Sequence, residues 1–205
     1  MRIGGLEPFT LSDYPGKVAA VVFTQGCNFR CPFCHNSSLL EIEHHQSQKL
    51  SCDDVCNFFR KRKHQLDGIV ISGGEPTLQN NLTSFLITLK DMGYFIKLDT
   101  NGSNPKALID LISKRLLDYI AMDVKAPLEK YEILSGTSLP YEKIKQSIKI
   151  ISESNIEHVF RTTFVPPLLS DEDILSIKSM IPKNSPYIVQ PFIKENALDK
   201  TLAQP

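Results

Sequence analysis

Gly68-Ile69-Val70-Ile71-Ser72 is a short run of apolar and β-branched residues, and Gly73-Gly74-Glu75-Pro76 follows it directly. Such a run, bounded by glycine and proline, predicts a short buried strand. Helical patterns lie on both sides of it, over residues 52–63 and 81–92. A strand between two helices is the repeating unit of a parallel sheet, so this part of the chain predicts an α/β fold.

The same alternation continues along the chain. Further strands are predicted over residues 18–24, 94–100, 119–123, 158–165 and 187–192. Further helices are predicted over residues 106–114, 142–153 and 171–180. Ser51 and Ser170 precede acidic residues at two of the helix starts. A serine hydroxyl there caps free backbone N–H groups, and acidic side chains suit the positive end of a helix.

Six strand-and-helix units are too few for a closed eight-stranded barrel. We therefore expect an open, partial barrel with parallel strands, while periodicity alone leaves a doubly wound sheet as an alternative. The length of 205 residues fits a single domain, residues 1–205, with a core of its own. Residues 43–49 are polar, and we expect a loop there.

The chain carries 23 basic and 23 acidic residues. This balance gives no overall field that would attract nucleic acid or an anionic membrane, so neither is an expected partner. The longest apolar run, residues 18–23, is too short to span a bilayer, and the first residues lack the apolar stretch of a signal peptide. We expect a cytoplasmic protein. Five cysteines, three of them within eight positions, fit metal binding better than a disulfide framework.

Cys27, Cys31 and Cys34 form the densest group of potential metal ligands. The gaps of three and two residues let three thiolates surround one soft metal centre, and Gly26 supplies the turn out of the preceding strand. A structural zinc or iron-sulfur site takes four protein ligands. Three thiolates on a cubane cluster would leave one iron open to a small molecule, which makes a cluster catalytic.

A structural zinc site is the alternative, with His35, Cys52 or Cys56 as the fourth ligand. His35 directly follows the last of the three cysteines, which is an awkward geometry for joint ligation. Cys52 and Cys56 lie one helical turn apart and could share a helix face. We expect them to pack as small apolar side chains. His44 and His45 are expected to be solvated loop residues.

Polar motifs follow the ends of the predicted strands. The cysteines follow the first strand and the glycine pair follows the second. Asp99-Thr100-Asn101-Gly102 ends the third strand, Met122-Asp123-Val124-Lys125 ends the fourth, and Arg161-Thr162-Thr163 lies in the fifth. In a parallel α/β fold the carboxyl ends of the strands share one face, where ligands bind. We therefore expect these motifs to converge on one cavity.

Each motif has a simpler reading when it is taken alone. Paired glycines let a backbone approach a ligand closely, but they also form ordinary tight turns. Asp99 and Asp123 could cap helices, and Lys125 could be a surface charge. Phe33 is placed either as a core aromatic or as a contact for a planar base. The alignment of the motifs at successive strand ends favours a shared site.

The run Gly26-Cys27-Asn28-Phe29-Arg30-Cys31-Pro32-Phe33-Cys34-His35-Asn36, with Gly73-Gly74-Glu75-Pro76, resembles the radical S-adenosylmethionine (SAM) superfamily, whose fold is a partial (β/α)6 barrel. With the Asp-Thr-Asn-Gly and Asp-Val-Lys motifs, the chain is similar to the glycyl-radical-enzyme activases. Among these it most resembles the anaerobic ribonucleoside-triphosphate reductase activating proteins. The similarity runs from Leu11-Ser12-Asp13-Tyr14-Pro15-Gly16-Lys17 to Pro191-Phe192.

The resemblance implies that Cys27, Cys31 and Cys34 hold a 4Fe-4S cluster whose open iron is chelated by SAM. It also implies a set of cofactor-binding residues at the strand ends: Phe33, Gly73, Gly74, Glu75, Asp99, Thr100, Asn101, Asp123, Lys125 and Arg161. No side chain is assigned as an acid or a base.

Within this set, the resemblance assigns the backbone of Gly73, Gly74 and Glu75 to the SAM amino group. Lys125 and Arg161 suit the SAM carboxylate through charge-assisted hydrogen bonds.

Phe33 is expected beside the adenine. Asp99 with Thr100 and Asp123 resembles a set that holds a monovalent cation near SAM, and direct contact of the aspartates with SAM is the alternative.

By the same resemblance, a flavodoxin or ferredoxin supplies the electron that cleaves SAM to methionine and a 5'-deoxyadenosyl radical. This radical abstracts hydrogen from a backbone glycine of the partner reductase, which must insert a loop at the cavity. Two alternatives stay open. One is a radical SAM enzyme that acts on a small molecule, as 7-carboxy-7-deazaguanine synthase does, and the other is a zinc-stabilised binding module.

Overall fold

A computed structural model describes residues 1–40, 50–138, 141–166 and 168–203. The loop predicted at residues 43–49, with its two histidines, lies outside these ranges. The described chain forms one sheet in which the strands follow the order of the sequence. These strands are β1 (Ile3–Thr10), β2 (Ala19–Thr24), β3 (Gly68–Gly73), β4 (Phe95–Thr100), β5 (Tyr119–Asp123), β6 (Glu157–Phe164) and β7 (Tyr187–Pro191).

Strands β2 to β7 pair in parallel, and β1 pairs with β2 in the antiparallel sense. In the described residues β1 and β7 are the two edges, so the sheet is an open barrel, as predicted. All six predicted strands are present. The seventh, β1, was not predicted because Gly4, Gly5 and Pro8 disfavour strands and most of its side chains are exposed.

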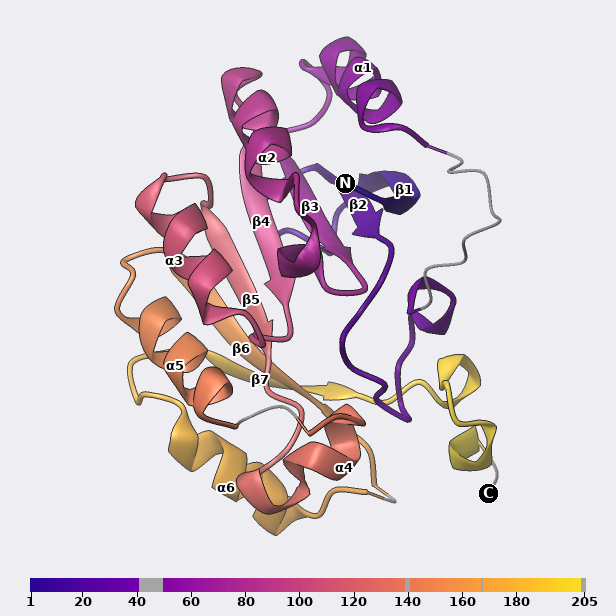
Figure 1. Ribbon diagram of the computed structural model, residues 1–205, viewed down its shortest axis with the longest axis vertical. Helices are drawn as coiled ribbons and strands as arrows, with labels where there is room; N and C mark the ends of the chain where they lie inside the picture. Colours follow the sequence, from indigo (N-terminus) through magenta and orange to yellow (C-terminus); the bar gives the residue numbers. More distant parts are fainter. Residues whose placement is uncertain (41–49, 139–140, 167, 204–205) are drawn as a thin grey trace.

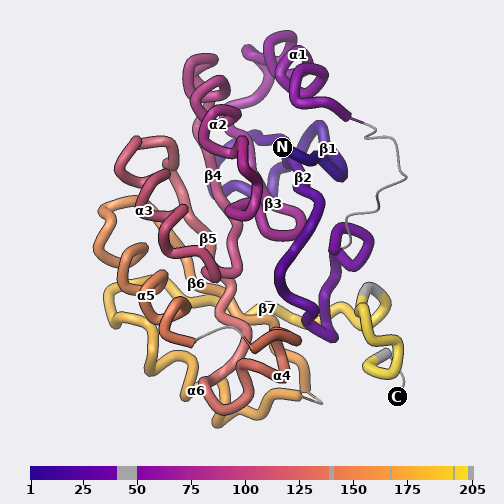
Figure 2. Tube along the Cα trace, in the orientation of Figure 1, coloured from indigo at the N-terminus to yellow at the C-terminus, as the bar shows by residue number. Residues whose placement is uncertain are grey.

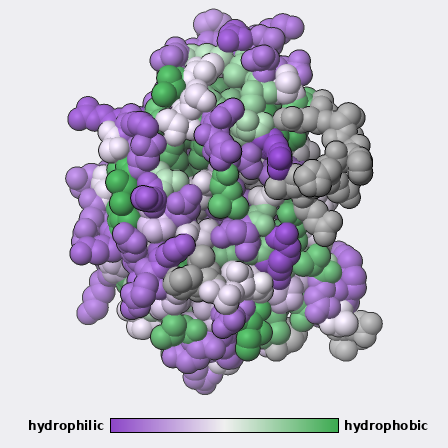
Figure 3. All heavy atoms as spheres, viewed as in Figure 1, coloured by the Kyte–Doolittle hydropathy of each residue, from purple (hydrophilic) through white to green (hydrophobic). Residues whose placement is uncertain are grey.

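Helices cover the outer face of the sheet (Figure 1). They are α1 (Cys52–Arg62), α2 (Leu82–Asp91), α3 (Pro105–Ser113), α4 (Tyr131–Ser135), α5 (Tyr141–Ser152) and α6 (Asp171–Met180). Ser51 and Ser170 each form a capping box, which confirms both predicted helix starts. The short helix α4 was not predicted. The surface over the helices is predominantly hydrophilic (Figure 3), because their apolar sides face the sheet.

Tyr14 fills the inside of the barrel near the amino ends of the strands. Its side chain is 2% exposed and packs in a small cluster with Val21 and Val70. The ring of Tyr119 lies 6.0 Å from it, centre to centre. The turn before β2 therefore forms a floor inside the barrel.

The cysteine segment after β2 runs beside the C-terminal residues (Figure 2). The Asp199 N–H donates to the Pro32 carbonyl at 2.8 Å, and the His35 ring stacks on Phe192 at 5.7 Å. No helix in the described part of the chain is long and apolar enough to cross a membrane.

Glu75 joins the ends of three strands. Its backbone N–H donates to the Gly26 carbonyl at 2.8 Å, just after β2. Its buried carboxylate accepts bonds from the Thr77 N–H and hydroxyl, from the Thr100 hydroxyl at 2.8 Å and from the Asn101 N–H at 2.7 Å. Burial raises the pKa of the Glu75 carboxyl, and the donated hydrogen bonds oppose that rise.

Gly73 and Gly74 are required by packing between these strand ends. Gly73 has φ +111°, and a Cβ there would lie 2.3 Å from the Thr24 nitrogen. A Cβ on Gly74 would lie 2.1 Å from the Gly26 carbonyl oxygen. The glycine pair is therefore more than an ordinary tight turn, because it lets β3 end against the start of the cysteine segment.

We predict that Glu75→Gln lowers the free energy of unfolding by about 1–3 kcal/mol, because an amide NH2 group cannot accept the bonds that the carboxylate accepts. Urea denaturation of the purified protein measures this change. Glu153→Gln, at an exposed position of the same residue type, is the control and should leave the midpoint unchanged. An equally small effect of both substitutions would contradict the role given to Glu75.

Candidate functional site

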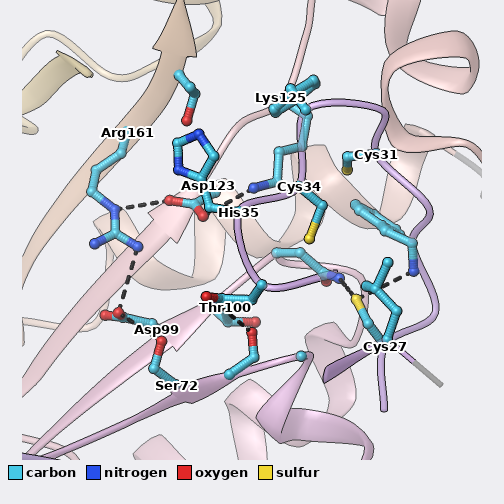
Figure 4. A pocket seen from close by; sticks show the side chains of 18 of the residues that line it. Cys27, Cys31, Cys34, His35, Ser72, Asp99, Thr100, Asp123, Lys125 and Arg161 are labelled. Atoms are coloured by element: carbon cyan, nitrogen blue, oxygen red, sulfur yellow. Dashed lines mark hydrogen bonds and ion pairs between the residues drawn. The ribbon is translucent and has the colours of Figure 1, made fainter. Parts of the chain in front are cut away.

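A cavity of about 390 Å³ opens at the carboxyl ends of the parallel strands (Figure 4). The predicted site residues that line it are Cys27, Cys31, Phe33, Cys34, Gly73, Gly74, Asp99, Thr100, Asn101, Asp123, Lys125 and Arg161. The structure thus brings together every motif that follows a predicted strand. Glu75 is the exception, since it does not line the cavity and its side chain binds the strand ends behind it.

The cysteine segment leaves β2 through Gly26, whose φ of +99° is a conformation that favours glycine. A turn then forms between Cys31 and Cys34, where the Cys34 N–H donates to the Cys31 carbonyl at 3.0 Å. The Arg30 N–H donates to the Ser135 carbonyl at 2.8 Å, which attaches the segment to α4. The helix that was not predicted from sequence therefore helps to hold the cysteines.

The cysteine sulfurs have polar neighbours within the protein. The Cys27 Sγ accepts hydrogen bonds from the Phe29 N–H at 3.3 Å and the Asn101 side-chain amide at 3.8 Å. Burial raises the pKa of Cys27, and it raises the pKa of Cys31 to about 12. A metal must therefore displace the Cys31 proton, because this thiol is not ionised near neutral pH.

The described residues offer no ligand set for the alternative of a structural zinc site. Among the described residues, no three His, Cys, Asp or Glu side chains are placed to hold a single metal ion. Cys52 and Cys56 do not line the cavity, and Cys56 is buried in the core as predicted. His35 does line it, but its Nε2 accepts the Ile193 N–H at 3.3 Å.

Opposite the cysteines, acidic and basic side chains form a connected network (Figure 4). The Arg161 Nε donates to Asp123 at 2.8 Å, and its terminal nitrogen lies 3.7 Å from Asp99. The Lys125 ammonium donates to Asp123 at 3.0 Å. Asp99 and Asp123 therefore face protein cations and are not helix caps, and Lys125 is not a simple surface charge.

These charges shift one another's ionisation. Burial alone would raise the pKa of Asp123, but Arg161 and Lys125 outweigh it and hold that pKa well below its usual value. For Lys125 and Arg161, burial would lower the pKa, but Asp123 outweighs it and raises both. All three groups are therefore charged over the whole physiological pH range.

Sequence reasoning missed two polar members of this network, Ser72 and Lys97. The Ser72 hydroxyl donates to Asp99 at 3.1 Å. The Lys97 ammonium also binds Asp99, although Lys97 is only 4% exposed. A lysine between Ile96 and Leu98 in a predicted buried strand was a signal that could have identified it, because it shares a strand face with Asp99.

The other lining residues lie outside the predicted set of cluster- and cofactor-binding residues. They are Asp13, Phe23, Phe29, Asn36, Leu40, Thr163 and Gln190, and Thr163 comes from the predicted Arg161-Thr162-Thr163 motif. Asp13 is exposed, and its carboxylate accepts hydrogen bonds from the hydroxyls of Thr10 and Ser12. It makes no ion pair with another described residue, so it stands apart from the charged network.

The sequence matches the radical SAM superfamily over residues 21–181. A Methanocaldococcus jannaschii protein, provisionally named a glycyl-radical enzyme activating enzyme, is 37% identical over 205 residues, with 97% of this chain and 82% of that protein covered. The pyruvate formate-lyase-activating enzyme of Streptococcus mutans is 28% identical over 186 residues, with 85% and 70% covered.

Streptococcus suis SuiB bound to S-adenosylmethionine has a similar fold, with a TM-score of 0.61 and 16% identity over 82% of this chain. The chain spans only 37% of the length of SuiB, and the likeness concerns the fold alone.

An open parallel barrel with three cysteines and a charged wall at its mouth, matched by this family over most of its length, defines the class: the chain belongs to the radical SAM superfamily. Within it, the chain belongs with the glycyl-radical enzyme activating enzymes. Radical SAM enzymes use a 4Fe-4S cluster and SAM. The predicted radical SAM superfamily, the predicted activase family and the predicted partial-barrel fold are confirmed.

The residues present fit such a cluster. Each of three cysteines in a cubane binds a different iron, so their sulfurs need not meet at one point, in agreement with the lack of a single-ion site among the described residues. The N–H groups that Phe29 and Asn101 direct at the Cys27 sulfur also suit a thiolate, since hydrogen bonds to sulfur tune clusters of this kind.

We predict that the stability difference between the wild type and Asp123→Asn narrows as the pH falls from about 6 to about 3. The folded-state pKa of Asp123 is depressed, so its contribution is present above the unfolded-state pKa and is lost as the pH falls toward the folded-state pKa. Denaturant titrations at several pH values measure the difference. A difference that stays constant would contradict the ion pairs assigned to Asp123.

Proposed function

We propose that this chain is an activase that uses a 4Fe-4S cluster and SAM to generate a glycyl radical on a partner enzyme. The observation that carries the proposal is the convergence of three cysteines, a glycine pair and a charged wall on one cavity. The 37% identity to a named activating enzyme supports the choice among radical SAM reactions. We assign the whole activity to a single domain, residues 1–205.

Cys27, Cys31 and Cys34 hold the cluster in this proposal. They lie on one segment that is fixed at Gly26 and at Arg30 by backbone hydrogen bonds. Binding iron replaces the proton of each thiol. Because burial opposes ionisation of Cys27 and Cys31, the charge of the metal is what keeps these thiolates stable inside the protein.

The strand ends hold SAM. Lys125 and Arg161 bind its carboxylate, the backbone of the lining residues Gly73 and Gly74 binds its amino group, and the lining residue Phe33 packs on its adenine. Further contacts come from Asp99, Thr100, Asn101 and Asp123.

When bound, the cluster and SAM supply an organic radical that can remove a hydrogen atom from a substrate. The chain's own residues orient SAM and exclude water. No side chain acts as an acid or a base.

The partner is a glycyl radical enzyme, and we propose an anaerobic ribonucleoside-triphosphate reductase, with a flavodoxin or ferredoxin as electron donor. The partner inserts its glycine loop at the open face of the barrel. Because thiols that bind iron must stay reduced, the proposal includes a cytoplasmic location. A pyruvate formate-lyase is the second candidate partner, favoured by 28% identity to an activase of that enzyme.

We predict that oxygen-free protein reconstituted with iron and sulfide releases 5'-deoxyadenosine from SAM when it is reduced. Electron paramagnetic resonance should then show a glycyl radical on a ribonucleoside-triphosphate reductase added to the mixture, and not on pyruvate formate-lyase. A radical on the lyase alone would assign the second partner. Release of 5'-deoxyadenosine with no radical on either protein would favour a small-molecule substrate.

Cysteine variants test the ligand set in the same preparation. Alanine at Cys27, Cys31 or Cys34 should remove most of the bound iron and abolish SAM cleavage, because each thiolate binds one corner of the cluster. The double variant Cys52→Ala and Cys56→Ala is the matched control and should keep iron and activity. Iron loss in the control, or retention in all three single variants, would contradict the assignment.

A further inference from the structure

Lys97 lies inside the barrel, between the floor and the cavity. It is on β4, paired in register with Val70 and Tyr119 of the neighbouring strands, both of which belong to the floor cluster. Its side chain is 4% exposed, and its ammonium binds the Asp99 carboxylate. Burying an ammonium group costs free energy unless it is paired with an anion, so Lys97 requires its ion pair with Asp99.

The bond to Lys97 changes what Asp99 can bind. Asp99 accepts from Lys97 and from the Ser72 hydroxyl at 3.1 Å, whereas Arg161 stays 3.7 Å away, beyond hydrogen-bonding distance. Arg161 uses its Nε for Asp123. In the described part of the chain, the terminal nitrogens of Arg161 donate no hydrogen bond, and Arg161 lines the cavity. These donors are therefore available to a ligand.

The cations of the network outnumber its carboxylates by one. Three cations, Lys97, Lys125 and Arg161, meet the two carboxylates of Asp99 and Asp123. Two further carboxylates lie nearby and stand outside this network: Glu75 accepts four hydrogen bonds behind the cavity wall, and the exposed Asp13 accepts from the hydroxyls of Thr10 and Ser12. Without Lys97 the charges would balance, and the wall would attract an anion less strongly.

We propose that the ammonium of Lys97 occupies the position that a monovalent metal cation would otherwise take beside Asp99. It neutralises Asp99 and leaves Arg161 free for the carboxylate of SAM. Lys97 is thus a positioning residue, and SAM binding by this chain requires neither potassium nor sodium. This assignment rests on the proposed function and is the alternative to the expectation that Asp99, Thr100 and Asp123 hold a cation.

The test is the affinity of the reconstituted, oxygen-free protein for SAM, measured by equilibrium dialysis in potassium chloride and in tetramethylammonium chloride of equal ionic strength. Wild-type affinity should agree within about twofold between the two salts. Lys97→Met should bind about tenfold more weakly in tetramethylammonium, the size expected for one lost charged hydrogen bond. It should regain affinity in potassium, because the small ion can enter beside Asp99.

Three further variants separate charge from packing. Lys97→Arg keeps the charge and should stay independent of potassium. Combining Lys97→Met with Asp99→Asn removes both charges and should abolish the potassium effect. Lys90→Met is the matched control, because Lys90 binds Asp118 at 2.8 Å without lining the cavity. This substitution should leave the affinity for SAM unchanged in both salts.

The outcomes distinguish this inference from the proposed function. Wild type that binds SAM only in potassium overturns the role of Lys97, and this comparison holds even if Lys97→Met fails to fold. Lys97→Met that matches the wild type in both salts also overturns it, as does a potassium effect that persists in the double variant. Wild type that binds SAM in neither salt overturns the proposed function and this assignment with it.

Discussion

The buried carboxylate of Glu75 is the contact on which the site depends. It accepts hydrogen bonds from Thr100 and Asn101 at the end of β4, while its own backbone is bonded to Gly26 at the end of β2. Asn101 in turn donates to the sulfur of Cys27. One carboxylate thus couples three strand ends to the cysteine segment, so the position of the first cysteine depends on Glu75, a residue that does not line the cavity.

Much of this arrangement could be predicted from the sequence, because each parallel strand is a short apolar run and each motif follows such a run. The convergence of the motifs then follows from topology alone. The edge strand β1 could not be predicted, since its glycines and proline hide its pairing with β2. Helix α4 has only five residues, too few to give a periodic signal.

The side-chain network was less accessible to sequence reasoning. Asp99 and Asp123 were placed correctly in the cavity. Their partners, however, depend on which face of each strand points inward and on which cation lies closest to each carboxylate in the folded protein. Lys97 has the spacing of an inward residue, yet only the packing of β4 shows that it binds Asp99 and leaves Arg161 open. The predicted SAM roles of these residues remain predictions.

Tyr14 is buried inside the barrel beneath Lys97, and the half-buried Tyr119 lies against it, so the charged network is open to solvent at the mouth of the cavity and packed against apolar rings on its other side. A protein that docks over the mouth therefore changes the solvent of the whole network at once. Each Coulomb interaction in it becomes stronger as water leaves and the local dielectric constant drops. The electrostatic attraction between the charged network and a ligand in the cavity is therefore stronger when a protein covers the mouth than when the mouth is open to water.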